Sequence, residues 1–187
     1  MTQLTVRASH PPIVHTASGR AVDLLHPDPA SIDLEDIARG LSHVCRFAGQ
    51  CRSFYSVAQH SVLCAQLVEP SLASSALLHD ATEAYLGDVP RPVKRQCPEY
   101  QVIEDRLHLA IAARFGLPPD MPEPIQRADT QMLIAEWAVL MQGPCPIPGP
   151  PAPLVVTPLG PTDAMALFLD AARRAGLTDE KAIPCTP

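Results

Sequence analysis

The sequence has few aromatic residues, few charged residues and no long apolar run. Aromatic residues make up 4% of the 187 positions, and charged residues make up 18%. No apolar stretch approaches the ~20 residues that cross a bilayer, and the first residues, MTQLTVRASHPPIVH, lack the apolar segment of a secretory signal. Because 47% of the residues are hydrophobic, the composition indicates an ordinary globular protein, which we expect in the cytoplasm and not in a membrane.

Basic residues are outnumbered by acidic ones. The chain has 14 Lys and Arg against 20 Asp and Glu, which gives a net charge of −6. Proteins that coat nucleic-acid polymers neutralise backbone phosphates with many Lys and Arg side chains. The charge therefore argues against a nucleic-acid polymer as a partner. It is compatible with a small phosphorylated ligand, because such a ligand needs only a local cationic pocket.

The six cysteines form no CxxC pair and no clustered framework; they lie at positions 45, 51, 64, 97, 145 and 185. This spacing disfavours a disulfide-stapled secreted fold and an all-cysteine zinc site. Cys64 falls on the apolar face of a predicted helix, where an unpaired cysteine usually acts as a small hydrophobic residue. We therefore predict that Cys64 is a core residue.

Hydrophobic periodicity predicts an all-α fold with a small N-terminal β-hairpin, folded as one domain over 1–187 with a core over about 33–142. The hairpin should pair 13–16 with 21–24 across a turn at 17–19. A helix capped by Asp33 should run towards Arg46. Further helices are expected over 56–68, 72–86, 103–116 and 125–140, and the glycine and prolines of 87–92 should form a loop.

The segment over 143–161 is rich in proline, which excludes a regular helix and predicts an extended excursion over the surface. A C-terminal helix over about 162–175 should pack back on the bundle through Ala166, Leu167 and Leu169. The last ten residues are predicted to form a tail.

Polar residues gather on a predicted core-facing helix and in the loop after it, in the segment LLHDATEAYLGDVPRPVK. Burying the imidazole of His79 beside the carboxylate of Asp80 is unfavourable unless something compensates, and a divalent cation is an effective partner. A His-Asp pair taken alone is more often a hydrogen-bonded surface pair. The pair therefore needs support from elsewhere in the chain.

Two residues on other predicted helices supply that support. His60 lies on the apolar face of the preceding helix, and Asp129 lies on a later one. Alone, His60 is more often a core histidine, and Asp129 a cap or a surface acid. Facing helices of a bundle often supply the ligands of one metal site. Together with His79 and Asp80 they predict one divalent transition metal, with Co, Mn, Zn, Fe and Ni not distinguished.

This H…HD…D pattern resembles the HD-domain phosphohydrolases over about 37–140. It is most similar to bacterial 5′-deoxynucleotidases of the YfbR type and to phage-type dATP triphosphohydrolases. A longer match, HDxxE followed by GDxPxPxK, runs from His79 to Lys94. The resemblance implies an HD-domain helical bundle, a nucleotide substrate and a homo-oligomer. It also implies that Glu83 works with a metal-activated water and that Asp88 lies beside the substrate.

Substrate contacts are also implied by the resemblance. Arg46-Phe47 resembles the family's Arg-Trp pair, which holds phosphate and borders the nucleoside; Phe replaces Trp here, and the spacing is shifted by about one residue. The alternative for Arg46 is a plain surface cation. Lys94 is a second candidate for offsetting phosphate charge, and Arg52 is a weaker one. His43 and His108 lack ligand-like spacing to the His-Asp doublet, which favours a mononuclear site.

The function expected from these residues is metal-dependent removal of phosphate from a deoxynucleoside monophosphate. One alternative is release of triphosphate from a deoxynucleoside triphosphate, because the ligand set alone does not separate the two reactions. A second alternative is a nucleotide-binding regulatory protein without turnover, and a third is a purely structural helical protein. Product identification separates the two hydrolases, and the structural alternative predicts that no metal is bound.

Overall fold

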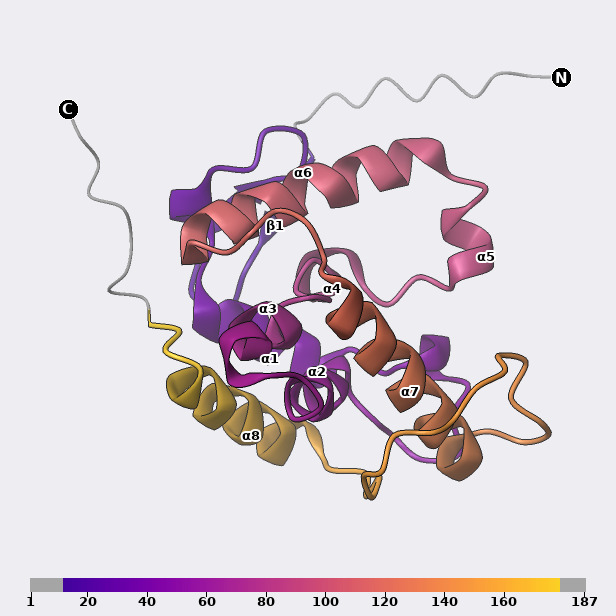
Figure 1. Ribbon diagram of the computed structural model, residues 1–187. Helices are drawn as coiled ribbons and strands as arrows, with labels where there is room; N and C mark the ends of the chain where they lie inside the picture. The colour runs from indigo at the N-terminus through magenta and orange to yellow at the C-terminus, as the bar shows by residue number, and fades with distance from the viewer. Residues whose placement is uncertain (1–11, 179–187) are drawn as a thin grey trace, which may run out of the picture.

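The computed structural model describes residues 12–178 and is mostly helical, with one small hairpin (Figure 1). The hairpin consists of β1 (Ile13–His15) and β2 (Ala21–Asp23). The helices are α1 (Leu34–His43), α2 (Val57–Ala65), α3 (Ala73–Leu77), α4 (Glu83–Leu86), α5 (Arg91–Lys94), α6 (Pro98–Phe115), α7 (Glu123–Leu140) and α8 (Pro161–Arg174). Short 3₁₀ turns lie at Pro29–Ser31, Phe47–Gly49 and Pro70–Leu72. Within the described residues, no helix combines the length and the apolar character that crossing a membrane requires.

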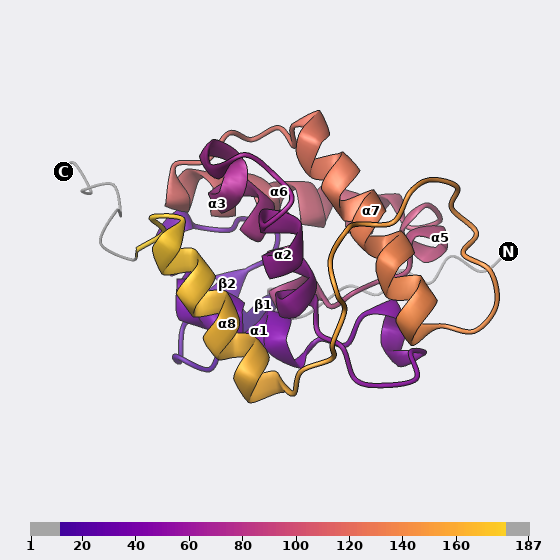
Figure 2. The same cartoon turned by 60° about the horizontal axis from the view of Figure 1, so that its bottom comes forward.

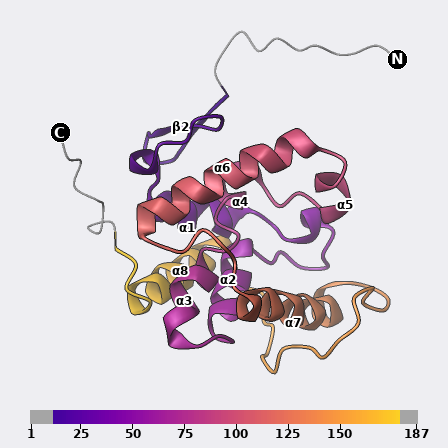
Figure 3. The same cartoon turned by 45° about the horizontal axis from the view of Figure 1, so that its top comes forward.

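The predicted hairpin is confirmed. Its strands are antiparallel, with Val14 opposite Val22, and Gly19 takes a positive φ of 85° in the turn. The turn is fixed to α1 by Ser18, whose backbone N–H and hydroxyl both donate to the Asp36 carboxylate, at 2.9 and 2.6 Å. Figure 3 shows the hairpin next to α6, at the end of the molecule away from α7.

The first helix begins as predicted but ends early. Asp33 caps α1 by accepting hydrogen bonds from the backbone N–H groups of Glu35 and Asp36. The chain leaves the helix after His43, because the backbone beyond it pairs with the segment before α2. The N–H of Arg46 donates to the Tyr55 carbonyl, and the N–H of Val57 donates to the Val44 carbonyl. The prediction of a helix running towards Arg46 is therefore wrong.

The continuous helix predicted over 72–86 is also wrong. The structure has α3 and α4 there, separated by turns over 78–82. A physical reason lies in His79, whose Nδ1 donates to the Ala76 carbonyl at 2.7 Å. In a continuous α-helix this carbonyl would accept the N–H of Asp80. The imidazole takes that acceptor, and the chain turns through shorter bonds such as Glu83 N–H to the Asp80 carbonyl.

The later helices match the predictions more closely. Gly116 ends α6 in the left-handed conformation, and α7 carries Asp129, both as expected. The helix predicted over 56–68 is shorter and ends at Ala65. The loop predicted over 87–92 contains the start of the one-turn helix α5, which accepts Pro92 because the first turn of a helix needs no N–H donor there.

The apolar core fills the space between the hairpin, α1, α2, α6 and α8. Helix α2 lies at its centre and contacts α1, α3, α7 and α8 (Figure 1). Buried apolar side chains from each element meet there, among them Val22, Ile37, Leu41, Val57, Leu107, Ile111 and Phe168. Helix α8 packs through Ala164, Phe168 and Ala172, with Leu167 and Leu169 partly buried against the core. Ala166 is exposed, so that part of the prediction for α8 is wrong.

The proline-rich segment has no regular structure, as predicted, but it does more than run over the surface. Ala152 and Val156 are buried, and the side chain of Gln59 donates to the Thr157 carbonyl and accepts from the Leu159 N–H. Figure 2 shows the segment leaving α7, looping outwards and returning alongside α7 to α8. The segment therefore covers α2 and α7. Apart from Thr178, the predicted tail lies outside the described residues.

Candidate metal centre

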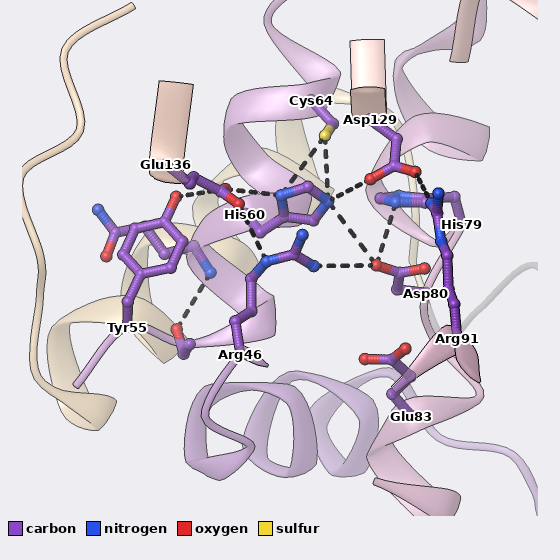
Figure 4. A network of polar contacts seen from close by, with 12 residues as sticks. Arg46, Tyr55, His60, Cys64, His79, Asp80, Glu83, Arg91, Asp129 and Glu136 are labelled. Atoms are coloured by element: carbon purple, nitrogen blue, oxygen red, sulfur yellow. Dashed lines mark hydrogen bonds and ion pairs between the residues drawn. The ribbon is translucent and has the colours of Figure 1, made fainter. Parts of the chain in front are cut away.

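The four predicted metal ligands converge on one point. His60 comes from α2, His79 and Asp80 from the turn after α3, and Asp129 from α7 (Figure 4). His60 Nε2 lies 3.3 Å from Asp129 Oδ1 and 3.7 Å from Asp80 Oδ2, and His79 Nε2 lies 3.2 Å from Asp80 Oδ2. Side chains far apart in the sequence thus bring two imidazole nitrogens and two carboxylate oxygens together. We call these four residues the ligand cluster.

Both imidazoles are held so that Nε2 faces the cluster. The Nδ1 of His60 lies 2.7 Å from Glu136 Oε1, and the Nδ1 of His79 lies 2.7 Å from the Ala76 carbonyl. A carboxylate and a carbonyl can only accept, so each Nδ1 carries the proton. In the neutral imidazole this leaves a lone pair on each Nε2. That orientation is typical of histidines that bind a metal through Nε2.

The Nε2 of His79 faces the Asp80 carboxylate and has no donor among the residues that the structure describes. His79 Nε2 is buried and makes no hydrogen bond within the described residues, although Asp80 lies nearby. A lone pair and a carboxylate oxygen repel each other unless a proton or a cation lies between them. The cluster therefore needs positive charge at its centre.

The pKa shifts in the metal-free protein show the same need. Burial alone would lower the pKa of His79, but the Asp80 carboxylate outweighs burial and raises it to about 9. Burial and Arg46 act against protonation of His60, yet the Cys64 sulfur and the Glu136 and Asp129 carboxylates raise the pKa of His60 well above its ordinary value. The pKa values of Asp80 and Asp129 are lowered despite burial, because the histidines favour their charged forms.

Glu136 connects the ligand cluster to the protein behind it. It is completely buried on α7, two turns after Asp129. Its Oε1 accepts from the Tyr55 hydroxyl at 2.9 Å and from His60 Nδ1, and its Oε2 accepts from Arg46 Nε at 3.0 Å. Burial alone would raise the pKa of Glu136, but Arg46 and His60 outweigh burial and hold it below its ordinary value. Glu136 is therefore a buried carboxylate with three donors.

Arg46 is not the surface cation of the alternative prediction. It is buried, and its Nη1 lies 3.6 Å from Asp80 Oδ2. Burial alone would lower the pKa of Arg46, but Glu136 and then Asp80 outweigh burial and raise it. The next residue, Phe47, has a positive φ of 57° and packs edge-on against Trp137. A non-glycine residue in this region is strained, so the surrounding structure holds the Arg46-Phe47 segment in place.

Glu83, one of the two predicted catalytic acids, lies beside the ligand cluster (Figure 4), and the other, Asp88, is half-buried in the loop after α4. Glu83 begins α4 and is buried; burial and the charges of Asp80 and Asp88 raise its pKa to about 9. Its Oε1 lies 3.6 Å from Lys94 Nζ, which also contacts Glu104 at 2.6 Å. Lys94 is therefore near the site but shared with another acid. The remaining cationic candidate, Arg52, is exposed and has no side-chain contact to the cluster within residues 12–178.

Several neighbours of the cluster were missing from the sequence prediction. Arg91, an exposed residue of α5, bonds Asp129 Oδ2 at 2.8 Å. Cys64 is buried as predicted, but its sulfur lies 3.4 Å from His60 Nε2. One ligand atom each of His60, Cys64 and His79 all lie within 4.8 Å of one another.

The sequence prediction also missed Glu136 and Tyr55. The available signal was that Glu136 interrupts the apolar stripe of its helix.

Comparison with known proteins shows the family. No family model matches the sequence. The chain is 43% identical over 152 residues to the uncharacterized protein YfdR of Escherichia coli strain K12, which covers 74% of this chain and 82% of that protein. The chain belongs to the YfdR family. Because the name of YfdR states no activity, the function of this YfdR-family chain has to be argued from the site.

A second relative is the uncharacterized protein RCAP_rcc00048 of Rhodobacter capsulatus. It is 46% identical over 121 residues, which is 59% of this chain and 62% of that protein. The chain thus spans less than two thirds of this relative. Its name also states no activity, so the similarity adds family membership but no function.

Proposed function

We propose that this YfdR-family protein is an HD-domain phosphohydrolase that uses one divalent metal to remove phosphate from a deoxynucleoside monophosphate. The observation that carries the proposal is the ligand cluster. Two Nε2 atoms and two carboxylate oxygens from α2, the turn after α3 and α7 meet with both Nδ1 atoms already bonded elsewhere. The match of residues 79–94 to the deoxynucleotidase signature supports the substrate class.

The donor chemistry of the cluster and its three nitrogen–oxygen distances support a divalent transition metal. Imidazole and carboxylate ligands suit Zn, Mn, Fe, Co or Ni better than calcium, which takes oxygen ligands. Ligand bonds of roughly 2.0 Å in a tetrahedral site place neighbouring ligand atoms about 3.3 Å apart. The three nitrogen–oxygen distances of 3.2, 3.3 and 3.7 Å are close to that value. The buried Nε2 of His79, which has no hydrogen bond within residues 12–178, would gain a partner.

When bound, the metal would supply a Lewis acid that polarises a phosphoryl oxygen and acidifies water. Glu83 would accept a proton from the water. In the metal-free protein its raised pKa keeps it protonated at neutral pH. Positive charge at Asp80 would offset one of the charges that raise this pKa, so the carboxylate form would become available to accept a proton.

Positive charge around the cluster would bind the phosphate. The bond from Arg46 Nε to Glu136 directs the Nη1 end of the guanidinium towards Asp80, where a phosphoryl group would lie. Lys94 lies beside Glu83, and its contacts with two acids hold it there. Asp88 lies close enough for its charge to act on Glu83, in keeping with the position beside the substrate that the family resemblance implies.

One observation favours the triphosphohydrolase alternative. Arg91 lies at the ligand cluster with its side chain 62% exposed, so it adds a solvent-facing cation near Asp129. Three cations, Arg46, Lys94 and Arg91, suit more than one phosphate. A deoxynucleoside triphosphate is therefore the second candidate substrate, with release of triphosphate as the reaction.

A substrate screen tests the proposal. Wild-type protein would be incubated with each of Mn²⁺, Co²⁺, Zn²⁺, Ni²⁺ and Fe²⁺ and with every dNMP and dNTP, and the products identified. We expect orthophosphate from at least one dNMP and none from the His79→Ala variant. Triphosphate released from a dNTP would support the second candidate instead. A wild-type protein that binds metal and nucleotide but releases neither product would contradict both and favour a regulatory protein.

A further inference from the structure

Glu136 is a buried charged residue that takes no direct part in the proposed reaction. It is 0% exposed, and an isolated buried carboxylate is unfavourable by several kcal/mol on the order of magnitude known for buried ions. Its three donors come from three segments: Arg46 from the loop after α1, Tyr55 from the segment before α2, and His60 from α2. Three hydrogen bonds thus stabilise the charged form of this carboxylate.

The direction of each bond matters. Glu136 Oε1 fixes the proton of His60 on Nδ1, which leaves Nε2 for the ligand cluster. Glu136 Oε2 fixes Nε of Arg46, and the opposite end of that guanidinium then lies 3.6 Å from Asp80. One carboxylate therefore sets the orientation of a ligand and of a cation that face the same point.

The position of Glu136 on α7 adds a mechanical link. Asp129 lies on the same helix seven residues earlier, so both carboxylates point to the same side of α7. A rigid helix thus carries one proposed ligand and the group that orients another. A shift of α7 would move both together and keep their spacing.

We infer that Glu136 is a positioning residue of the metal centre, which orients His60 for metal binding and Arg46 for phosphate binding. The inference rests on the proposed function. Residues that bond the far nitrogen of a ligating histidine usually contribute about 10–100-fold to metal affinity. The opposing interpretation is that Glu136 only ties Arg46 and Tyr55 together for stability.

Three variants separate these interpretations. Glu136→Gln keeps the shape but removes the charge and one acceptor atom. Tyr55→Phe removes one of the three bonds without touching His60 or Arg46. Glu123→Gln makes the same chemical change on the same helix at an exposed position. The affinity for Zn²⁺ and Mn²⁺ would be measured by competition with a chelator, and the melting temperature recorded for each variant.

We expect Glu136→Gln to bind each metal about 10–100-fold more weakly, and Glu123→Gln to match the wild type. Tyr55→Phe should lower the melting temperature with less than about a threefold change in affinity, because the bond to His60 remains. A Glu136→Gln variant that melts earlier but binds metal as tightly as the wild type would overturn the inference and leave a purely structural role.

A spectroscopic measurement on the wild type keeps the inference testable if Glu136→Gln does not fold. In the zinc-loaded protein, ¹H–¹⁵N spectra of the histidine side chains should show the His60 proton on Nδ1, shifted downfield by its bond to a carboxylate. A proton on Nε2 would overturn the inference. If the wild type binds no metal, the proposed function fails as well, and that outcome is distinct from tight binding that ignores Glu136.

Discussion

Two buried regions lie on either side of α2 and are built in opposite ways. The apolar core towards α1 and α8 contains side chains such as Ile37, Leu41 and Phe168, all with no exposure. In the region towards α7, His60 and Glu136 are equally inaccessible to solvent, yet those residues are charged or polar. Burial of apolar surface stabilises the first region, whereas the second depends on matched charges. We therefore assign stability mainly to the apolar core and the proposed chemistry to the ligand cluster.

The two regions meet where α1 packs on α4. Gly40 of α1 allows a close approach: a Cβ at this position would lie 2.8 Å from the Ala84 carbonyl oxygen and 2.9 Å from its Cα. Glu83 is the residue before Ala84, so the apolar core helps to place a proposed catalytic acid. Substitutions in each region in turn test whether the apolar core and the ligand cluster are separate.

The largest effect on stability is expected in the apolar core. Phe168→Ala should lower the free energy of unfolding by about 3–5 kcal/mol, because it removes a fully buried ring and leaves a cavity. Urea denaturation measures the loss, with Val155→Ala, a change at an 86% exposed position, as the control. Metal affinity of the folded protein should stay within about twofold. A parallel loss of metal affinity would show that the two regions are not separate.

An intermediate effect is expected at the junction. Gly40→Ala should lower the free energy of unfolding by about 2 kcal/mol. The added Cβ would meet the backbone of Ala84, which cannot move aside as a flexible side chain could. Gly160→Ala is the matched control, since a Cβ there meets nothing within 4 Å; we expect less than about 1 kcal/mol. Hydrolysis should fall with Gly40→Ala because Glu83 moves. Equal stabilities of the two variants would contradict the close packing.

The smallest effect concerns the charge of Glu83 and appears as a pH dependence. The unfolded chain loses this proton near pH 4.5, whereas the folded metal-free protein keeps it to about pH 9. The folded state therefore binds more protons between these values, and its stability falls as pH rises. His79 adds to the same trend, since its stabilising protonation is complete below pH 6.5 and is lost through about pH 9.

We expect metal-free wild type to lose about 1 kcal/mol of unfolding free energy from Glu83 alone between pH 7 and pH 8. Glu83→Gln should remove that part of the slope and keep the part from His79. Thermal or urea unfolding of metal-free protein at both pH values checks this, with Glu123→Gln as the control. Identical slopes in Glu83→Gln and wild type would show that Glu83 is not protonated in the folded state.

The sequence predicted the parts of the fold that depend on local patterns. The hairpin, the Asp33 cap and the Gly116 helix end follow from short-range rules and are confirmed. The errors arose where a distant or side-chain partner replaces a helical hydrogen bond. The backbone N–H of Arg46 donates to the Tyr55 carbonyl and not to a carbonyl of α1. The His79 ring bonds the Ala76 carbonyl, which would otherwise have continued α3. Helical periodicity does not report such competition.

The candidate site shows the same division. Residue types and the order H…HD…D were enough to choose four side chains that the fold brings together. Glu136 was not chosen, because a single acid on an apolar stripe does not reveal its partners. Its role depends on His60 and Arg46, which lie 76 and 90 residues away in the sequence. Contacts of this kind become visible only when α2 and α7 are placed side by side.

Elemental analysis measures whether the ligand cluster holds a metal. Wild type and His79→Ala would be loaded with Mn²⁺, Co²⁺ or Zn²⁺, dialysed, and measured for metal per chain. We expect about one metal per wild-type chain for at least one of these ions and close to none for His79→Ala. Equal metal content in the two proteins, or none in the wild type, would contradict the proposed metal centre.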